Sequence, residues 1–119
     1  MTAYSERVRA YFAAPAHAGD LPDGQVVNVD DQGVRLRLSA IVVGGIVESM
    51  RFRAWGCPHT IAAAEAACAL LEGAPAETLL EFPISGLMEE LSIPVEKTGR
   101  ILVLEDAVRS LGRAIGDGS

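Results

Sequence analysis

The chain lacks the features of exported, disulfide-rich and membrane-spanning proteins. It has only two cysteines, too few for a disulfide framework. Its start, Met1–Arg9, is polar and has no apolar core of the kind found in signal peptides. A strongly apolar run such as Ala40–Val43 is far shorter than the roughly 20 residues that a transmembrane helix needs. These absences predict a cytoplasmic protein with reduced thiols and no membrane partner.

The balance of charges excludes another class of partner. The formal net charge is −6, and an acidic chain does not attract phosphate backbones, so general nucleic-acid binding is not expected. Half of the 119 residues are apolar, which predicts a single domain, residues 1–119, with one core. Arg35, Arg37, Arg51 and Arg53 are candidates for a small basic patch that would bind an acidic partner.

The first half of the chain predicts one helix followed by three strands. Apolar residues recur at helical spacing over Tyr4–Ala14, where Ser5 can cap the helix and Pro15 can end it. Alternating or apolar segments then predict strands over 25–30, 34–42 and 46–55. Tight turns at 30–33 and 44–45 join these strands, which makes an antiparallel meander.

The second half predicts helices only. An alanine-rich helix is expected over 58–72, with Pro58 in its first turn. Short helices over 76–82 and 85–91 and a long amphipathic helix over 100–115 follow. The predicted fold class is therefore α+β: a three-stranded antiparallel meander with an N-terminal helix and C-terminal helices packed on one face.

Cys57 is the residue with the clearest chemical potential. It follows a strand and Gly56, and it precedes Pro58 at the predicted start of a helix. Free N–H groups at a helix N-terminus favour a thiolate, which is both a metal ligand and a nucleophile. The alternative is a small buried side chain in a tight turn, because free cysteines are often simply buried.

The other possible ligands are weaker candidates. Cys68 lies about 16 Å further along the same predicted helix, too far to share a metal with Cys57, and its apolar neighbours favour a place in the core. His59 forms a Cys-x-His pair with Cys57, but two ligands do not make a zinc site. His17 falls in a loop, where solvent exposure is expected. No phosphate-binding glycine loop or Gly-x-Ser-x-Gly motif indicates an independent enzyme.

Several stretches occur in the order and spacing of one known family. They are the opening helix from Tyr4 with the loop 15–19, the strand 45–55 that leads into Gly56-Cys57-Pro58, the helix start 60–64, and Leu104-Glu105-Asp106-Ala107. Together they resemble the IscU/NifU N-terminal family, the scaffolds on which iron–sulfur clusters are assembled. The resemblance implies an IscU/NifU-like fold over nearly the whole chain.

The ligand set of that family is mostly missing. The resemblance places Cys57 at the second of three family cysteines. Counted without gaps, Asp31 stands at the first cysteine and Gly33 at the site aspartate, whereas Arg100 stands at the third cysteine and Gly99 at the neighbouring histidine. What remains implies a degenerate metal site of Cys57 and Asp31, with His59 as a possible auxiliary ligand.

A cluster needs about three or four soft ligands, so this set cannot hold one alone. We instead predict an ion pair between Asp31 and Arg100 over Cys57. The family's chaperone-recognition segment falls on 93–97, where Ile93, Pro94 and Lys97 match and are candidate partner-binding residues.

Three functions follow from the resemblance. The first is a divergent scaffold or assembly accessory that shares an iron–sulfur cluster, iron or zinc with a partner or in a homodimer. The second is a regulatory adaptor that binds no metal and docks to cluster-assembly proteins such as a cysteine desulfurase. The third is a carrier in which Cys57 accepts sulfur as a persulfide.

Overall fold

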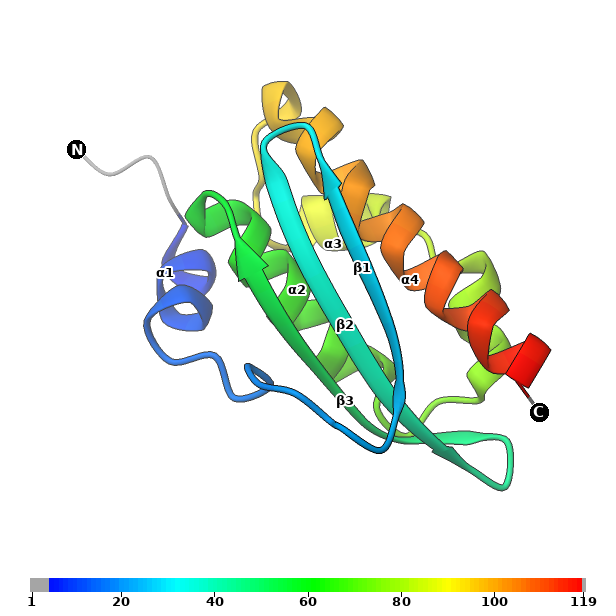
Figure 1. The fold of residues 1–119 in the computed structure, drawn as a ribbon. Helices are drawn as coiled ribbons and strands as arrows, with labels where there is room; N and C mark the ends of the chain where they lie inside the picture. Colours follow the sequence, from blue (N-terminus) through cyan, green and yellow to red (C-terminus); the bar gives the residue numbers. More distant parts are fainter. Residues whose placement is uncertain (1–4, 119) are drawn as a thin grey trace.

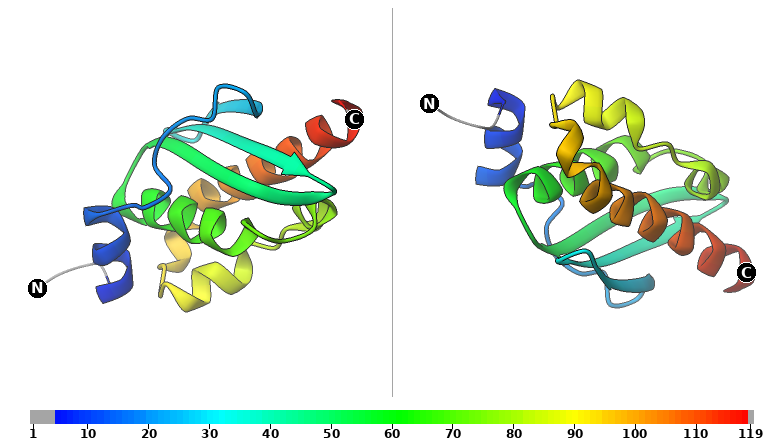
Figure 2. Two further views of the ribbon diagram at one scale, coloured as in Figure 1. Left: turned by 90° about the horizontal axis from the view of Figure 1, so that it is seen from below. Right: turned by 90° about the horizontal axis from the view of Figure 1, so that it is seen from above.

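A three-stranded sheet carries helices on one face. The computed structural model describes residues 5–118, and Figures 1 and 2 show the helices gathered on one side of the strands. The predicted fold class is confirmed. In chain order the elements are α1 (Glu6–Ala13), β1 (Gln25–Asp31), β2 (Val34–Val43), β3 (Ile46–Trp55), α2 (Pro58–Leu71), the 3₁₀ helix η1 (Ala76–Glu81), α3 (Ser85–Glu90), the 3₁₀ helix η2 (Val95–Lys97) and α4 (Thr98–Gly118).

The strands form the predicted antiparallel meander in the order β1-β2-β3. The first turn is tighter than predicted, because Asp30 and Asp31 continue β1 and only Gln32 and Gly33 connect the strands. Both turn residues have positive φ, 53° and 74°, as a two-residue hairpin turn requires. β3 has the predicted bounds, and the ends of the other predicted elements lie within three residues of the expected ones.

The two faces of the sheet differ as the alternation predicts. Leu36, Leu38 and Phe52 are buried under the helices, whereas Arg37 and Arg53 lie opposite each other on the other face. Two like charges directly opposite repel. Asp20 offsets this repulsion because its carboxylate pairs with both guanidinium groups, at 3.5 Å from Arg37 Nε and 2.5 Å from Arg53 Nε.

The helices are positioned by small and apolar side chains. Ser5 caps α1 as predicted, its hydroxyl accepting a hydrogen bond from Val8 N at 3.2 Å; Tyr4, the predicted first residue of this helix, lies outside the described residues. Almost every alanine of α2 is buried, so this helix lies close to the sheet. The predicted stripe of α4 is confirmed, with four buried members: Ile101, Leu104, Val108 and Leu111. No helix of residues 5–118 is both long and apolar enough to cross a membrane.

Candidate functional site

Three segments that are distant in the sequence meet at one end of the sheet. The register pairs Asp31 with Val34 and Arg35 with Trp55, so the β1–β2 turn and Cys57 lie at the same end. Figure 1 shows the tip of this hairpin beside the start of α4, which carries Arg100. We call this region, with Asp31, Cys57 and Arg100, the Cys57 end. Two strand spacings separate the backbone of Asp31 from that of Gly56, a distance of about 10 Å.

Cys57 is the N-cap residue of α2 and is half-buried. Its Sγ lies 3.5 Å from Thr60 Oγ1. Burial by itself raises the pKa of the thiol. Hydrogen bonds from the Thr60 side chain, from the backbones of Thr60 and His59 and from the Arg100 side chain outweigh burial, so the pKa lies below its ordinary value of 9.0. The helix N-terminus thus favours a thiolate, as the sequence predicts.

Arg100 and Asp31 do not pair with each other. Among residues 5–118 no ion pair joins these two side chains, so the predicted bridge over Cys57 is wrong. The Asp31 carboxylate instead accepts a hydrogen bond from Gln32 N at 2.9 Å. The side chain of Arg100 makes the smallest of the contributions that lower the pKa of the Cys57 thiol. The cation that the resemblance places at the third cysteine position therefore favours the thiolate of Cys57, and the placement itself stays a prediction.

The two glycines that the resemblance predicts at other ligand positions, Gly33 and Gly99, have open space around them. Gly33 lies in the hairpin turn and Gly99 in the first turn of α4. A Cβ atom at either position would meet no atom within 4 Å. Crowding therefore does not exclude a larger side chain at either position. At Gly33, however, the φ of 74° would strain any residue other than glycine.

His59 is buried, with 2% of its surface exposed. Burial and, next, the positive charge of Lys97 lower the pKa of its imidazole, while Glu96 opposes this shift. His59 is therefore neutral at pH 7 and lies within electrostatic reach of the η2 segment. Its role as an auxiliary ligand stays a prediction.

The candidate partner-binding segment runs along the surface before α4. Ile93 is buried, Pro94 and Lys97 are half-buried, and Val95 is 81% exposed. The hydroxyl of Thr98 donates a hydrogen bond to Val95 O at 2.6 Å, which fixes the segment against the start of α4. Its partner-binding role also stays a prediction.

The described residues do not assemble a metal site of their own. Within 5–118 no three His, Cys, Asp or Glu side chains are grouped so that they could hold one metal ion. Cys68 offers no ligand either, because it is fully buried in α2, as predicted. Burial, and then the charges of Glu65 and Glu72, raise the pKa of this second thiol.

A polar network that the sequence did not predict holds the N-terminal loop. His17, expected in solvent, donates its backbone N–H to Glu65 Oε1 at 2.7 Å, and its Nδ1 lies 2.6 Å from Glu65 Oε2. Its Nε2 lies 3.3 Å from Glu72, which also accepts from Arg51 at 2.6 Å. Glu65 is 3% exposed. No sequence signal marks these partners, because they come from three elements that the fold brings together.

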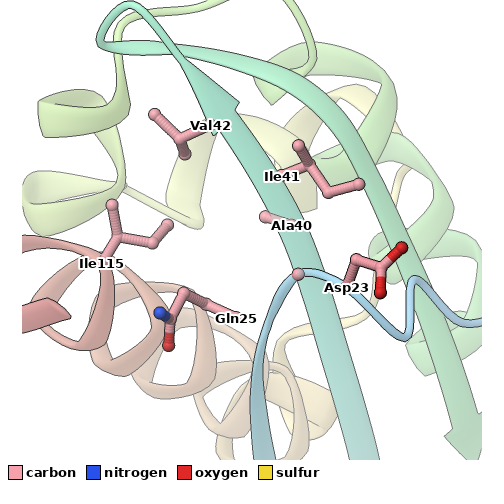
Figure 3. Close-up of a pocket in the computed structure, with 7 residues that line it drawn as sticks. Asp23, Gln25, Ala40, Ile41, Val42 and Ile115 are labelled. Carbon is pink, nitrogen blue, oxygen red and sulfur yellow. The ribbon is translucent and has the colours of Figure 1, made fainter. Parts of the chain in front are cut away.

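Two cavities differ in their relation to Cys57. One of about 250 Å³ lies between the start of β1, the end of β2 and the end of α4, and Figure 3 shows Gln25, Val42 and Ile115 around it. It is at the opposite end of the sheet from Cys57. A second, of about 270 Å³, lies beside the end of β3, between Phe12 and Trp55. Only the second is close to the thiol.

Comparison with known proteins identifies the same family over most of the chain. The family model described as "NifU-like N terminal domain" matches residues 3–115. The iron-sulfur cluster assembly scaffold protein IscU of Azotobacter vinelandii is 29% identical over 119 residues, which cover 93% of this chain and 92% of that protein. The iron-sulfur cluster assembly protein IscU of Plasmodium falciparum is 25% identical over 112 residues, which cover 89% and 69%.

A solved structure shows the same fold. The crystal structure of a nitrogen-fixing NifU-like protein (N-terminal) from Brucella abortus superposes with a TM-score of 0.76 at 16% identity, covering 97% of this chain and 95% of that one. Some relatives are longer, since this chain spans 59% and 64% of two mitochondrial proteins from Schizosaccharomyces pombe and Debaryomyces hansenii.

Proposed function

Because the chain belongs to the NifU-like N-terminal domain family, whose members are scaffold proteins and not enzymes, we propose that it is an accessory protein of iron–sulfur cluster assembly that accepts sulfur on Cys57. One observation carries this proposal. The thiol at the Cys57 end caps the N-terminus of α2 and has a lowered pKa, to which Arg100 contributes from the position that the resemblance gives to a third cysteine. That pair suits an anionic sulfur species better than a metal cation.

The proposed reaction needs only a persulfide donor, such as a cysteine desulfurase. The Cys57 thiolate attacks the outer sulfur of the donor's persulfide. A new S–S bond forms on Cys57, the donor's S–S bond breaks, and the donor's cysteine leaves as a thiolate with the electron pair. No oxidant or reductant is consumed. Arg100, which helps to lower the pKa of Cys57, would stabilise the attacking thiolate and then the persulfide anion, because both carry a negative charge.

Mass spectrometry tests this function directly. After incubation with a cysteine desulfurase and cysteine, the protein should carry one extra sulfur that a reducing agent removes. Cys57→Ser should abolish the adduct, and Cys68→Ser should leave it unchanged, which makes the two variants a matched pair. Absence of the adduct on a wild-type protein that still binds the desulfurase would refute sulfur transfer to Cys57.

A second candidate function is a cluster or metal shared with a partner or a second copy of the chain. Asp31 supports it, because it lies on the helix-covered side of the sheet with Val34 and at the same end as Cys57. In that case a partner supplies the missing thiolates. Anaerobic iron titration of the chain alone and with the desulfurase separates the two functions, since shared binding requires uptake only in the complex and loss of uptake in Cys57→Ser.

A further inference from the structure

The outer edge of β3 is only partly covered. β3 is an edge strand, and at Phe52 the chain's own loop completes it: Phe52 N donates to His17 O at 3.0 Å, and Gly19 N donates to Phe52 O at 2.8 Å. In an antiparallel strand, every second residue directs its N–H and C=O toward the same edge. The backbone groups of Ala54 therefore point outward, as those of Phe52 do. Within residues 5–118, Ala54 has no hydrogen bond to any segment outside the sheet.

The open edge at Ala54 lies in a groove with apolar walls. The cavity of about 270 Å³ beside the end of β3 is lined by Ala54 and by the apolar side chains of Phe12, Pro15, Trp55 and Ile61. Phe12 is 46% and Trp55 54% exposed, although both are large apolar side chains. We call this cavity with the Ala54 edge the β3 groove. Unpaired strand groups between exposed aromatic walls are typical of a site where an extended segment adds to a sheet.

The surroundings of the β3 groove are positive in an acidic protein. Arg53 lines the groove, and Arg35 and Arg37 lie beside it on the open face of the sheet. Asp20 and Asp30 are the carboxylates paired with these three guanidinium groups, so the five groups together carry one excess positive charge. The whole chain has a net charge of −6. A segment with acidic side chains is therefore favoured here over a basic one.

We propose that the β3 groove binds an extended, acidic and apolar segment of the sulfur-donor protein, which pairs with Ala54 as an added strand. This inference rests on the proposed function, since it assigns the surface that brings the donor to Cys57. The chain's own residues 17–19 show that this edge accepts an extended backbone two residues before Ala54. In a strand, successive side chains alternate, so one would enter the apolar groove and the next would face Arg53.

The position of the groove also fits delivery of sulfur. Ala54 precedes Cys57 by three residues, which an extended chain spans in about 10 Å. A donor segment bound at Ala54 would therefore hold the rest of the donor protein within about 10 Å of the Cys57 thiol. A second copy of this chain is a different occupant, and the experiment below separates it.

The experiment measures amide hydrogen exchange of the wild-type chain with and without a saturating cysteine desulfurase. The Ala54 amide should exchange at least about tenfold more slowly in the complex, because it gains a hydrogen-bond acceptor. The Phe52 amide, already bonded to His17, is the internal control and should change little. Ala54→Pro, which removes the donor, should weaken binding about tenfold.

A second variant covers the case in which Ala54→Pro fails to fold. Phe12→Asp changes an exposed side chain of α1 and places a carboxylate in the groove without touching β3, and it should also weaken binding about tenfold. Val43→Asp places the same carboxylate on an exposed side chain at the opposite end of the sheet and should bind the desulfurase like the wild type. If all of these results are obtained, the proposal stands.

The other outcomes overturn it in distinguishable ways. A desulfurase that binds and loads sulfur on Cys57 while the Ala54 amide exchanges at its free rate would refute the docking surface and leave the proposed function intact. Protection of Ala54 in the chain alone, rising with concentration and with dimer formation in analytical ultracentrifugation, would assign the groove to a second copy instead. Absence of any complex would remove both proposals.

Discussion

The two cysteines belong to one helix and have opposite chemistry. Cys57 caps the N-terminus of α2 and is half-buried, and polar contacts lower the pKa of its thiol despite the opposing effect of burial. Cys68 lies eleven residues later, about 16 Å along the axis, where it is fully buried and its pKa is raised. The first four N–H groups of a helix have no partners within it, so a thiolate gains hydrogen bonds only at that end. Position along the helix thus decides which thiol is reactive.

The largest expected effect comes from restoring ligands around Cys57. The double substitution Asp31→Cys and Arg100→Cys should raise the affinity for zinc about a thousandfold, because three thiolates would then converge where one now stands. Isothermal titration calorimetry measures this affinity. The matched control is Asp30→Cys with Leu102→Cys, which adds the same number of thiols at exposed neighbouring positions. Equal zinc affinity in the two double variants would contradict the convergence at the Cys57 end.

A second prediction contrasts the reactivity of the two thiols. Iodoacetamide at pH 7 should alkylate Cys57 about a hundredfold faster than Cys68 in the folded protein, because thiolate content and access both favour Cys57. Mass spectrometry of digested samples over time gives both rates. In denaturant the two rates should converge, and comparable rates in the native protein would show that the surroundings of α2 do not separate the thiols.

A third prediction concerns stability, for which Cys68 should matter more than the reactive Cys57. Cys68→Ser places a hydroxyl in the core and should lower the free energy of unfolding by about 2 kcal/mol. Cys57→Ser should change it by less than about 0.5 kcal/mol, because serine is itself a favoured N-cap residue. Urea denaturation followed by circular dichroism measures both, and a larger loss in Cys57→Ser would contradict this assignment.

The smallest expected effect isolates the cation beside Cys57. Arg100→Met removes a group that stabilises the thiolate, so the pKa of Cys57 should rise and the alkylation rate at pH 7 should fall roughly two- to fivefold. The pH dependence of the alkylation rate locates the pKa, and its midpoint should move to higher pH. Arg113→Met, which removes the arginine paired with Ser110 further along α4, is the control and should leave the midpoint in place. An unchanged midpoint in Arg100→Met would show that the guanidinium does not act on the thiol.

The local features of this protein follow from its sequence alone. Alternation of apolar and charged residues over 34–38 predicts the strand and its two faces, and the stripe from Ile101 to Leu111 predicts the buried side of α4. Gly56 and Pro58 around Cys57 predict a thiol at a helix start. These predictions succeed because each depends on the preferences of residues that are neighbours along the chain or on one face of one element.

What only the tertiary structure decides is which distant side chains meet. The resemblance led us to expect an ion pair between Asp31 and Arg100, yet the Asp31 carboxylate accepts from Gln32 N and Arg100 contributes to the lowered pKa of Cys57. His17 binds Glu65 instead of lying in solvent. The loop that contains His17 pairs with the backbone of Phe52, whereas the backbone of Ala54 has no such partner among residues 5–118. A polar side chain often has several possible partners of similar interaction energy. Which partner it binds is determined only when the packing of helices and strands fixes the distances between the side chains.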